Sequence, residues 1–215
     1  GVQQLVHTLN TTATMSTTTT VEAASLAPPR NPYKGLKPFT EKDETDFFGR
    51  AKLIENLVRR IDKTKETDAR LVAVIGPSGS GKSSVVMAGV LPQLNKGVDH
   101  GTIRGSENWT YFEPMLPGNH PIENLAITLH KQLKDTWDLP SIQHNLEQPR
   151  GLHVLAKSGL KSQRTDFAVL FIDQFEEIFT QTADVEERER FIKLITKAAT
   201  EPDGRLIILI TLRAD

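Results

Sequence analysis

Hydrophobic residues along the chain follow two patterns that alternate with each other. Short apolar runs predict buried strands over 71–75, 167–172 and 206–212, and a weaker run predicts a strand over 109–112. Apolar residues at helical spacing predict helices over 50–63, 83–94, 122–133, 152–160 and 186–199. The segment 138–150 follows neither pattern and is expected to be a loop. Alternating strands and helices predict an α/β fold with a parallel sheet covered on both faces.

Residues 1–30 lack both patterns. Thr dominates from Thr8 to Thr20, and Ala and Pro are frequent up to Pro29. This composition buries too little apolar area to fold. We therefore expect a Thr-rich linker over 1–30, which includes the tail of a possible upstream domain. An N-terminal segment over 31–69 and a core domain over 70–215 follow it.

Composition narrows the functional classes. The chain has no cysteine, which excludes disulfides, thiolate nucleophiles and Cys-based zinc sites, and favours a cytoplasmic location. The formal net charge is −1, so overall electrostatics give no reason to expect nucleic acid or an anionic membrane as partner. The longest apolar runs are far shorter than the roughly 18 residues that a membrane helix needs.

The most informative motif follows the first predicted strand and precedes a predicted helix. It is a complete G-x-x-x-x-G-K-[ST] phosphate-binding loop (P-loop), Gly76-Pro77-Ser78-Gly79-Ser80-Gly81-Lys82-Ser83. In such a loop the backbone N–H groups converge on the phosphates at the positive end of a helix. We expect these residues and Ser84 to bind ATP or ADP. Lys82 is expected to reach the β- and γ-phosphates, and the Ser83 hydroxyl to bind Mg²⁺.

Acidic residues follow the strand over 167–172. Asp173 directly after this strand is the expected second magnesium ligand, because Mg²⁺ prefers carboxylate, water and phosphate oxygens. The run continues with Gln174, Glu176 and Glu177. One of these residues is expected to orient the attacking water; Glu176 is the first choice, and Glu177 and Gln174 remain alternatives.

Arg213 follows the last predicted strand. In P-loop ATPases with the strand order 5-1-4-3-2, that strand lies between the P-loop strand and the strand that carries the acidic residue. Its carboxyl end then opens onto the γ-phosphate. Arg213 is therefore expected to sense or neutralise γ-phosphate charge.

These motifs, taken with Asn31-Pro32-Tyr33-Lys34-Gly35-Leu36 and Phe47-Phe48-Gly49-Arg50, closely resemble the bacterial STAND class of signal-transduction NTPases. The resemblance covers roughly residues 31–215, with five motifs in the expected order. It implies a P-loop NTPase three-layer sandwich with the strand order 5-1-4-3-2. It also implies that the fifth strand, a lid and a winged-helix segment follow residue 215. Gly49 and Arg50 are expected near the adenine and ribose, and Thr211 and Arg213 as the first sensor.

The resemblance also implies a regulatory switch. ADP holds such proteins in a closed monomer, and exchange for ATP allows self-association and effector activation. An upstream effector domain and a downstream repeat sensor are the partners expected in the full-length chain. ATP hydrolysis is expected of that full-length protein rather than of residues 1–215.

Other functions fit the residues less well. A GTPase requires D-x-x-G, but the third residue after Asp173 is Glu176. A kinase or transport ATPase that acts by continuous turnover, and a nucleotide-binding scaffold without hydrolysis, remain the alternatives to a switch.

Overall fold

The computed structural model describes residues 34–35, 37–97, 103–163 and 166–214. The predicted linker over 1–30 and the first three residues of the 31–69 segment lie outside these ranges. Among the described residues, the first elements are η1 (Glu41–Asp46), α2 (Ala51–Thr64), β1 (Leu71–Gly76), α3 (Lys82–Ser84), η2 (Val85–Val90) and α4 (Leu91–Lys96). Those that follow are η4 (Ser106–Asn108), β2 (Thr110–Tyr111), α5 (Pro121–Leu133), α6 (Leu139–Leu146), α7 (Gly151–Gln163), β3 (Ala168–Ile172), α8 (Glu177–Thr180), α9 (Val185–Thr200) and β4 (Leu206–Arg213).

The strands form a parallel four-stranded sheet in the order β1-β4-β3-β2. β4 is central: Ile208 lies opposite Leu71 of β1 and Leu170 of β3. The predicted α/β class and parallel sheet are confirmed, although the weak strand is reduced to Thr110–Tyr111. The fifth strand of the predicted order 5-1-4-3-2 stays a prediction.

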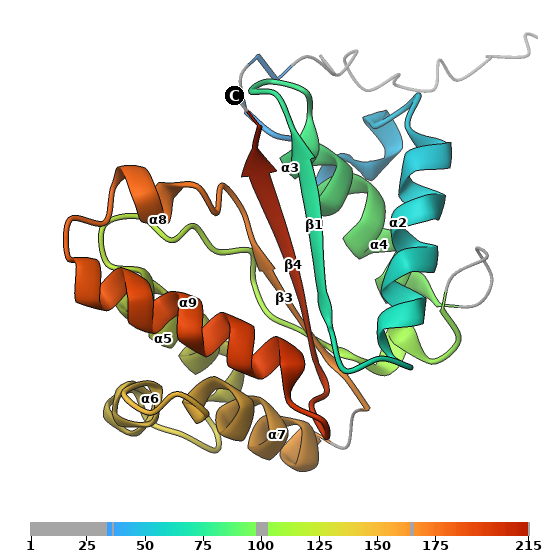
Figure 1. Ribbon diagram of the computed structural model, residues 1–215. Helices are drawn as coiled ribbons and strands as arrows, with labels where there is room; N and C mark the ends of the chain where they lie inside the picture. The colour runs from blue at the N-terminus through green and yellow to red at the C-terminus, as the bar shows by residue number, and fades with distance from the viewer. Residues whose placement is uncertain (1–33, 36, 98–102, 164–165, 215) are drawn as a thin grey trace, which may run out of the picture. The chain divides into compact units, whose positions relative to one another are not determined.

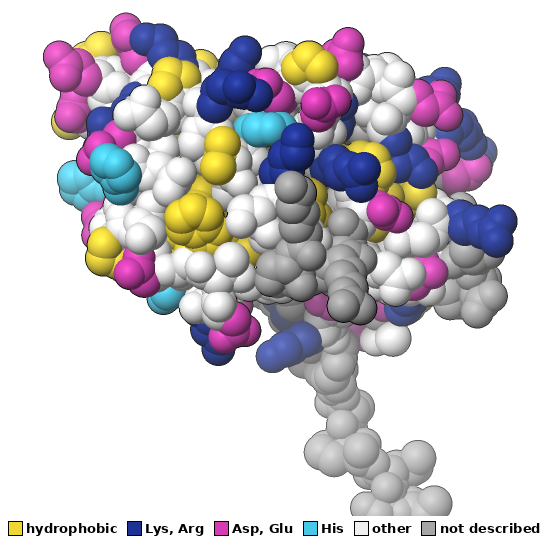
Figure 2. All heavy atoms as spheres, turned by 90° about the horizontal axis from the view of Figure 1, so that it is seen from below, with side chains coloured by type: hydrophobic (Ala, Val, Ile, Leu, Met, Phe, Trp, Pro, Cys, Tyr) yellow, Lys and Arg dark blue, Asp and Glu magenta, His cyan; other side chains and the backbone are white. Residues whose placement is uncertain are grey.

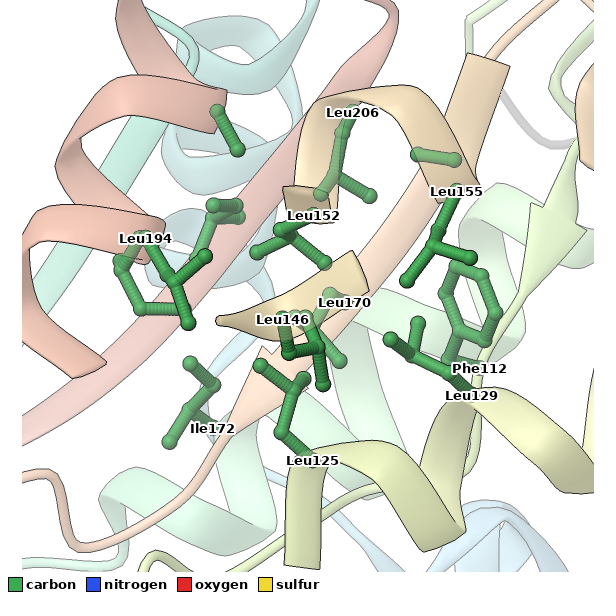
Figure 3. Close-up of a cluster of buried hydrophobic side chains, with 14 of the residues drawn as sticks. Phe112, Leu125, Leu129, Leu146, Leu152, Leu155, Leu170, Ile172, Leu194 and Leu206 are labelled. Atoms are coloured by element: carbon green, nitrogen blue, oxygen red, sulfur yellow. The ribbon is translucent and has the colours of Figure 1, made fainter. Parts of the chain in front are cut away.

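Helices cover both faces of the sheet (Figure 1). Successive residues of β3 point to opposite faces, as the two-residue period of a strand requires. Leu170 packs into the core beneath α5, α6, α7 and α9, which Figure 3 shows in close-up. Phe171 packs into the second core, which lies beneath α2 and the helical run 82–96. All five residues of β3 are buried, so its carboxyl end is held in place from both sides.

The helical run 82–96, called here the P-loop helix, contains a π-helical segment at η2. Gly89 in this segment lies against α2: a Cβ built there would come within 2.5 Å of Ile54 Cδ1. Ile54, Val58 and Ile61 of α2 are buried in the same core. α2 therefore packs directly on the P-loop helix.

The loop predicted over 138–150 is wrong, because α6 occupies Leu139–Leu146. The Asp138 carboxylate accepts a hydrogen bond from the Ser141 N–H at 2.8 Å and caps the helix. Ile142 and Leu146 are fully buried, four residues apart on one helical face. Leu139, which packs against the same core, Ile142 and Leu146 are too few apolar residues for this eight-residue helix to stand out in the sequence.

The surface seen in Figure 2 carries basic and acidic side chains that are interspersed. In the described part of the chain, no helix combines the length and apolar character needed to cross a bilayer.

Candidate functional site

The P-loop connects β1 to the P-loop helix through two glycines with left-handed backbone conformations. Gly79 has φ 71° and Gly81, the residue that caps α3, has φ 85°. A Cβ at either position would meet no atom within 4 Å, so the backbone conformation, and not crowding, requires glycine. This conformation leads the chain from the carboxyl end of β1 directly into the N-terminus of a helix. The N-terminus of a helix attracts anions.

Lys82 lies at the start of the P-loop helix. Its ammonium donates hydrogen bonds to the carbonyl oxygens of Gly76 and Pro77, both at 2.9 Å. The Ser80 N–H donates to the same Pro77 carbonyl at 3.3 Å. The ammonium is therefore held over the loop that is expected to bind phosphate.

Asp173 is buried at the carboxyl end of β3 and collects three hydrogen bonds on one oxygen. Its Oδ1 accepts from the Ser83 hydroxyl at 2.7 Å, the Thr211 hydroxyl at 2.5 Å and the Gln174 N–H at 3.1 Å. Its backbone N–H donates to the Met115 carbonyl at 2.8 Å. Three segments far apart in sequence are thus joined at a single carboxylate.

Gln174 is the only non-glycine residue of the described ranges with a positive φ, 52°. Its N–H donates to Thr211 Oγ1 at 2.8 Å, and the next residue, Phe175, donates its N–H to the Thr211 carbonyl at 2.9 Å. Such a conformation costs about 1–3 kcal/mol and persists where the surroundings enforce it. The two bonds to Thr211 of β4 therefore hold the backbone conformation of the residues that follow β3.

These groups line a cavity of about 350 Å³, a volume within the usual range for small-molecule sites. Its walls are Gly35, Lys37, Pro38, Phe39, Ser78, Gly79, Gly81, Lys82, Ser83, Ser84, Asp173, Gln174, Glu176, Thr211 and Arg213. The structure thus brings together predicted site residues from the P-loop, from the end of β3 and from the end of β4. A larger cavity of about 470 Å³ lies beside η1, α4 and β2, but no P-loop residue lines it.

The donor set fits a magnesium ion. Ser83 donates its hydroxyl proton to Asp173, which leaves the lone pairs of Ser83 Oγ for a cation. Asp173 Oδ2 accepts no hydrogen bond from the residues that the structure describes. Across those residues no group of three or more His, Cys, Asp or Glu is placed to hold a metal. A magnesium ion here would therefore depend on Ser83, Asp173, water and phosphate oxygens.

Several predicted residues lie outside the cavity walls. Glu177 accepts a hydrogen bond from the Gly118 N–H at 3.1 Å, which ties its carboxylate to the loop before α5. Gly49 and Arg50, expected at the adenine and ribose, are exposed at the start of α2 and do not line the cavity. Among P-loop residues, Gly76, Pro77 and Ser80 support Lys82 and the loop without lining the cavity.

None of the predicted site residues lies in the segment that forms the remaining wall. Residues 34–35 and 37–40, called here the strap, contribute Gly35, Lys37, Pro38 and Phe39 to the cavity. The Phe39 N–H donates to Ser84 Oγ at 3.0 Å, so Ser84 serves the strap as well as the P-loop. The only sequence signal was the motif over 31–36, because the strap lacks periodic apolar residues.

Comparison with known proteins identifies the family of the chain. The model of the family described as Novel STAND NTPase 1 matches residues 32–215. No curated protein matches the chain. Among solved structures, one similar chain is described as "Structure of pCW3 conjugation coupling protein TcpA monomer form with ATPgS", at 15% identity and a TM-score of 0.33. The match covers 67% of the present chain and 43% of that one, so the present chain corresponds to less than half of its length.

Proposed function

The chain belongs to the Novel STAND NTPase 1 family, and we propose that its 350 Å³ cavity binds ATP or ADP with Mg²⁺ as the site of a regulatory switch. The observation that carries this proposal is the meeting of Ser83 and Thr211 on Asp173. It joins the P-loop helix to the ends of β3 and β4, where ligands of parallel sheets bind.

Each proposed role follows from position and chemistry. The P-loop backbone and Lys82 bind the β- and γ-phosphates, and Ser83 and Asp173 hold the ion. Arg213, at the end of β4, binds the γ-phosphate, and Thr211 transmits its presence to Asp173. When bound, Mg²⁺ neutralises charge that develops on the phosphates.

For hydrolysis we propose Glu176 as the base. Its carboxylate lines the cavity and accepts a hydrogen bond from the Arg213 N–H at 3.2 Å. Water attacks the γ-phosphorus, the bond to the β–γ bridging oxygen breaks, ADP leaves, and Glu176 takes the proton. Gln174, which also lines the cavity, orients the water; Glu177 is the weakest candidate because its carboxylate is bonded to Gly118.

The switch role is proposed for the full-length protein. There, exchange of ADP for ATP biases a bistable assembly, because the two nucleotides differ in affinity for its two states. The partners are a second copy of the NTPase domain, an upstream effector joined through residues 1–30, and a downstream repeat sensor. We also propose that this protein is cytoplasmic. For the complete sheet of the full-length protein we propose the strand order 5-1-4-3-2.

Nucleotide binding is the direct test. The wild-type chain and the variants Lys82→Ala, Asp173→Asn and Lys193→Ala are titrated with a fluorescent ATP analogue, with and without Mg²⁺. Lys193, on the exposed face of α9, is the matched control. We expect Lys82→Ala to abolish binding, Asp173→Asn to remove the effect of Mg²⁺, and Lys193→Ala to behave as wild type. Equal binding by all four proteins would refute the proposed site.

Turnover separates a switch from an enzyme whose purpose is continuous hydrolysis. We expect the full-length protein to hydrolyse ATP slowly until its trigger is present. Many turnovers per second without any trigger would contradict the switch.

A further inference from the structure

The strap is anchored to the P-loop helix and to η1 by specific polar contacts. Phe39 donates its N–H to Ser84 Oγ at 3.0 Å, next to the predicted magnesium ligand Ser83. At the far end of the P-loop helix, Lys96 forms an ion pair of 2.6 Å with Glu44 of η1. The strap and η1 therefore bridge the two ends of this helix.

Asp43 holds the strap in this position. Its Oδ2 accepts the Thr40 N–H at 2.9 Å, the Thr40 hydroxyl at 2.8 Å and the Lys34 ammonium. The Asp43 residue is only 6% exposed, whereas the side chain of Lys34 is 34% exposed, so the carboxylate is buried and its ammonium partner is not. The Phe39 ring packs against Phe47, with the ring centroids 5.8 Å apart. Residues 37–39 are thus held along the cavity by a small number of contacts.

Lys37 differs from the other lysines around it. Lys34 is paired with Asp43, and Lys82 is bonded to P-loop carbonyls. The Lys37 ammonium has no hydrogen-bond or ion-pair partner among the described residues, although Lys37 lines the cavity. Lys37 is exposed and shares the walls of this cavity with residues of the P-loop. An ammonium without a protein partner can bind phosphate oxygens there without first giving up another bond.

Lys37 determines the net charge of the side chains that line the cavity. Lys82 and Arg213 are the other cations in its walls, and Asp173 and Glu176 are the acids. The two positive charges and the two negative charges cancel, so Lys37 supplies the net positive charge of the cavity. A nucleotide with bound Mg²⁺ remains an anion, and a net positive site attracts it.

We propose that Lys37 is a second phosphate-binding lysine of the nucleotide site, held in place by the strap, with Asp43 as its positioning residue. This inference rests on the proposed function, because it names a further ligand of the same nucleotide. The ligand class is a nucleoside di- or triphosphate.

The test is titration of the whole chain with a fluorescent ATP analogue at low and at moderate salt. Lys37→Ala should weaken binding roughly tenfold or more, as expected for loss of a charged hydrogen bond. It should also make the salt dependence shallower, because one ionic contact is gone. Lys37→Arg should keep most of the affinity, and Lys42→Ala, which removes a nearby lysine outside this cavity, should leave affinity unchanged.

Lys82→Ala separates the two proposals. If it abolishes binding while Lys37→Ala binds as wild type does, the role of Lys37 is refuted and the nucleotide site stands. If the wild-type chain does not bind ATP, the proposed function fails and this inference fails with it. Asp43→Asn should weaken nucleotide binding in the wild-type chain. In the Lys37→Ala variant it should cause no further loss, because Asp43 acts through Lys37. Additive losses from the two substitutions would refute the positioning role of Asp43.

Lysine acetylation followed by mass spectrometry tests the contact without any substitution. ATP should protect Lys37 and Lys82 from the reagent and leave Lys42 fully reactive. Equal labelling of Lys37 with and without ATP, alongside protected Lys82, would overturn the inference.

Discussion

Replacing Thr211 by Val tests whether the hydrogen bonds at Asp173 hold the site together. The Thr211 hydroxyl donates to Asp173 Oδ1 at 2.5 Å and accepts from the Gln174 N–H at 2.8 Å. Thr211 is 1% exposed, so water cannot replace either bond. Valine keeps the shape of the side chain and removes both bonds.

The size of the effect follows from the charge of the acceptor. A hydrogen bond to a charged group contributes about 1.5–3 kcal/mol, and a bond between neutral groups about 0.5–1.5 kcal/mol. Thr182 is an internal control: it is 3% exposed, and its hydroxyl donates to the neutral Gly118 carbonyl at 2.9 Å. We therefore expect Thr211→Val to lower the free energy of unfolding by about 2 kcal/mol, and Thr182→Val by about 1 kcal/mol.

Urea unfolding of the nucleotide-free chain measures these values, and a double-mutant cycle with Asp173→Ala isolates the bond. The coupling between Thr211→Val and Asp173→Ala should be about 1–2 kcal/mol, whereas Thr182→Val should be additive with Asp173→Ala within about 0.5 kcal/mol. Additivity between the Thr211 and Asp173 substitutions would show that this hydrogen bond does not stabilise the fold.

Three further predictions address backbone strain, packing and pH. Gln174→Gly should raise the free energy of unfolding by about 1 kcal/mol, because it relieves the positive φ; lower stability in urea would contradict this. Gly89→Ala should lower the free energy of unfolding by about 1–3 kcal/mol in the wild type. The loss should be much smaller beside Ile54→Ala, which removes the two atoms that would lie closer than 3.0 Å to the new Cβ; equal losses in both backgrounds would contradict this. The bond from Lys34 lowers the pKa of Asp43 to about 2. In the unfolded protein the pKa of this carboxyl is about 4. The stabilisation that ionised Asp43 gives the folded protein is therefore complete above that pH, and it is lost as the pH falls through about 2. The difference in Tm between wild type and Asp43→Asn should shrink over that interval, and a constant difference would contradict it.

Strong local patterns predicted the parts of the molecule that depend on neighbours in sequence. The apolar runs of β3 and β4 predicted buried strands, and both are buried on both faces. The similar run of β1 also predicted a buried strand, but β1 lies at the edge of the sheet, and Leu71 and Ile75 are exposed. The P-loop was predictable because its glycines and Lys82 act within the loop itself, whereas the bond from Ser83 to Asp173 spans 90 residues of sequence. Asp173 was predictable from its place directly after a buried strand.

The rest depends on contacts between distant segments. Glu176 and Glu177 are adjacent in sequence but have different surroundings. Glu177 accepts a hydrogen bond from Gly118, whereas Glu176 lines the cavity. The strap is bonded to the P-loop helix through the Phe39 N–H and Ser84 Oγ, two residues that are 45 positions apart in sequence. No periodicity within either segment could indicate these partners.

The burial of β3 and β4 has a consequence for how the two sides of the cavity fluctuate. Amides of strands packed on both faces exchange with solvent only when much of the protein unfolds, whereas segments held by a few contacts open locally at far lower free energy. Asp173 and Thr211 extend from such strands, so that side of the cavity keeps its geometry until the sheet itself opens. The strap is held mainly by the contacts of Asp43, Phe39 and Ser84. The cavity thus combines one side that opens only with the sheet and one side that can open alone, which would give the proposed nucleotide a route in and out that leaves the sheet intact.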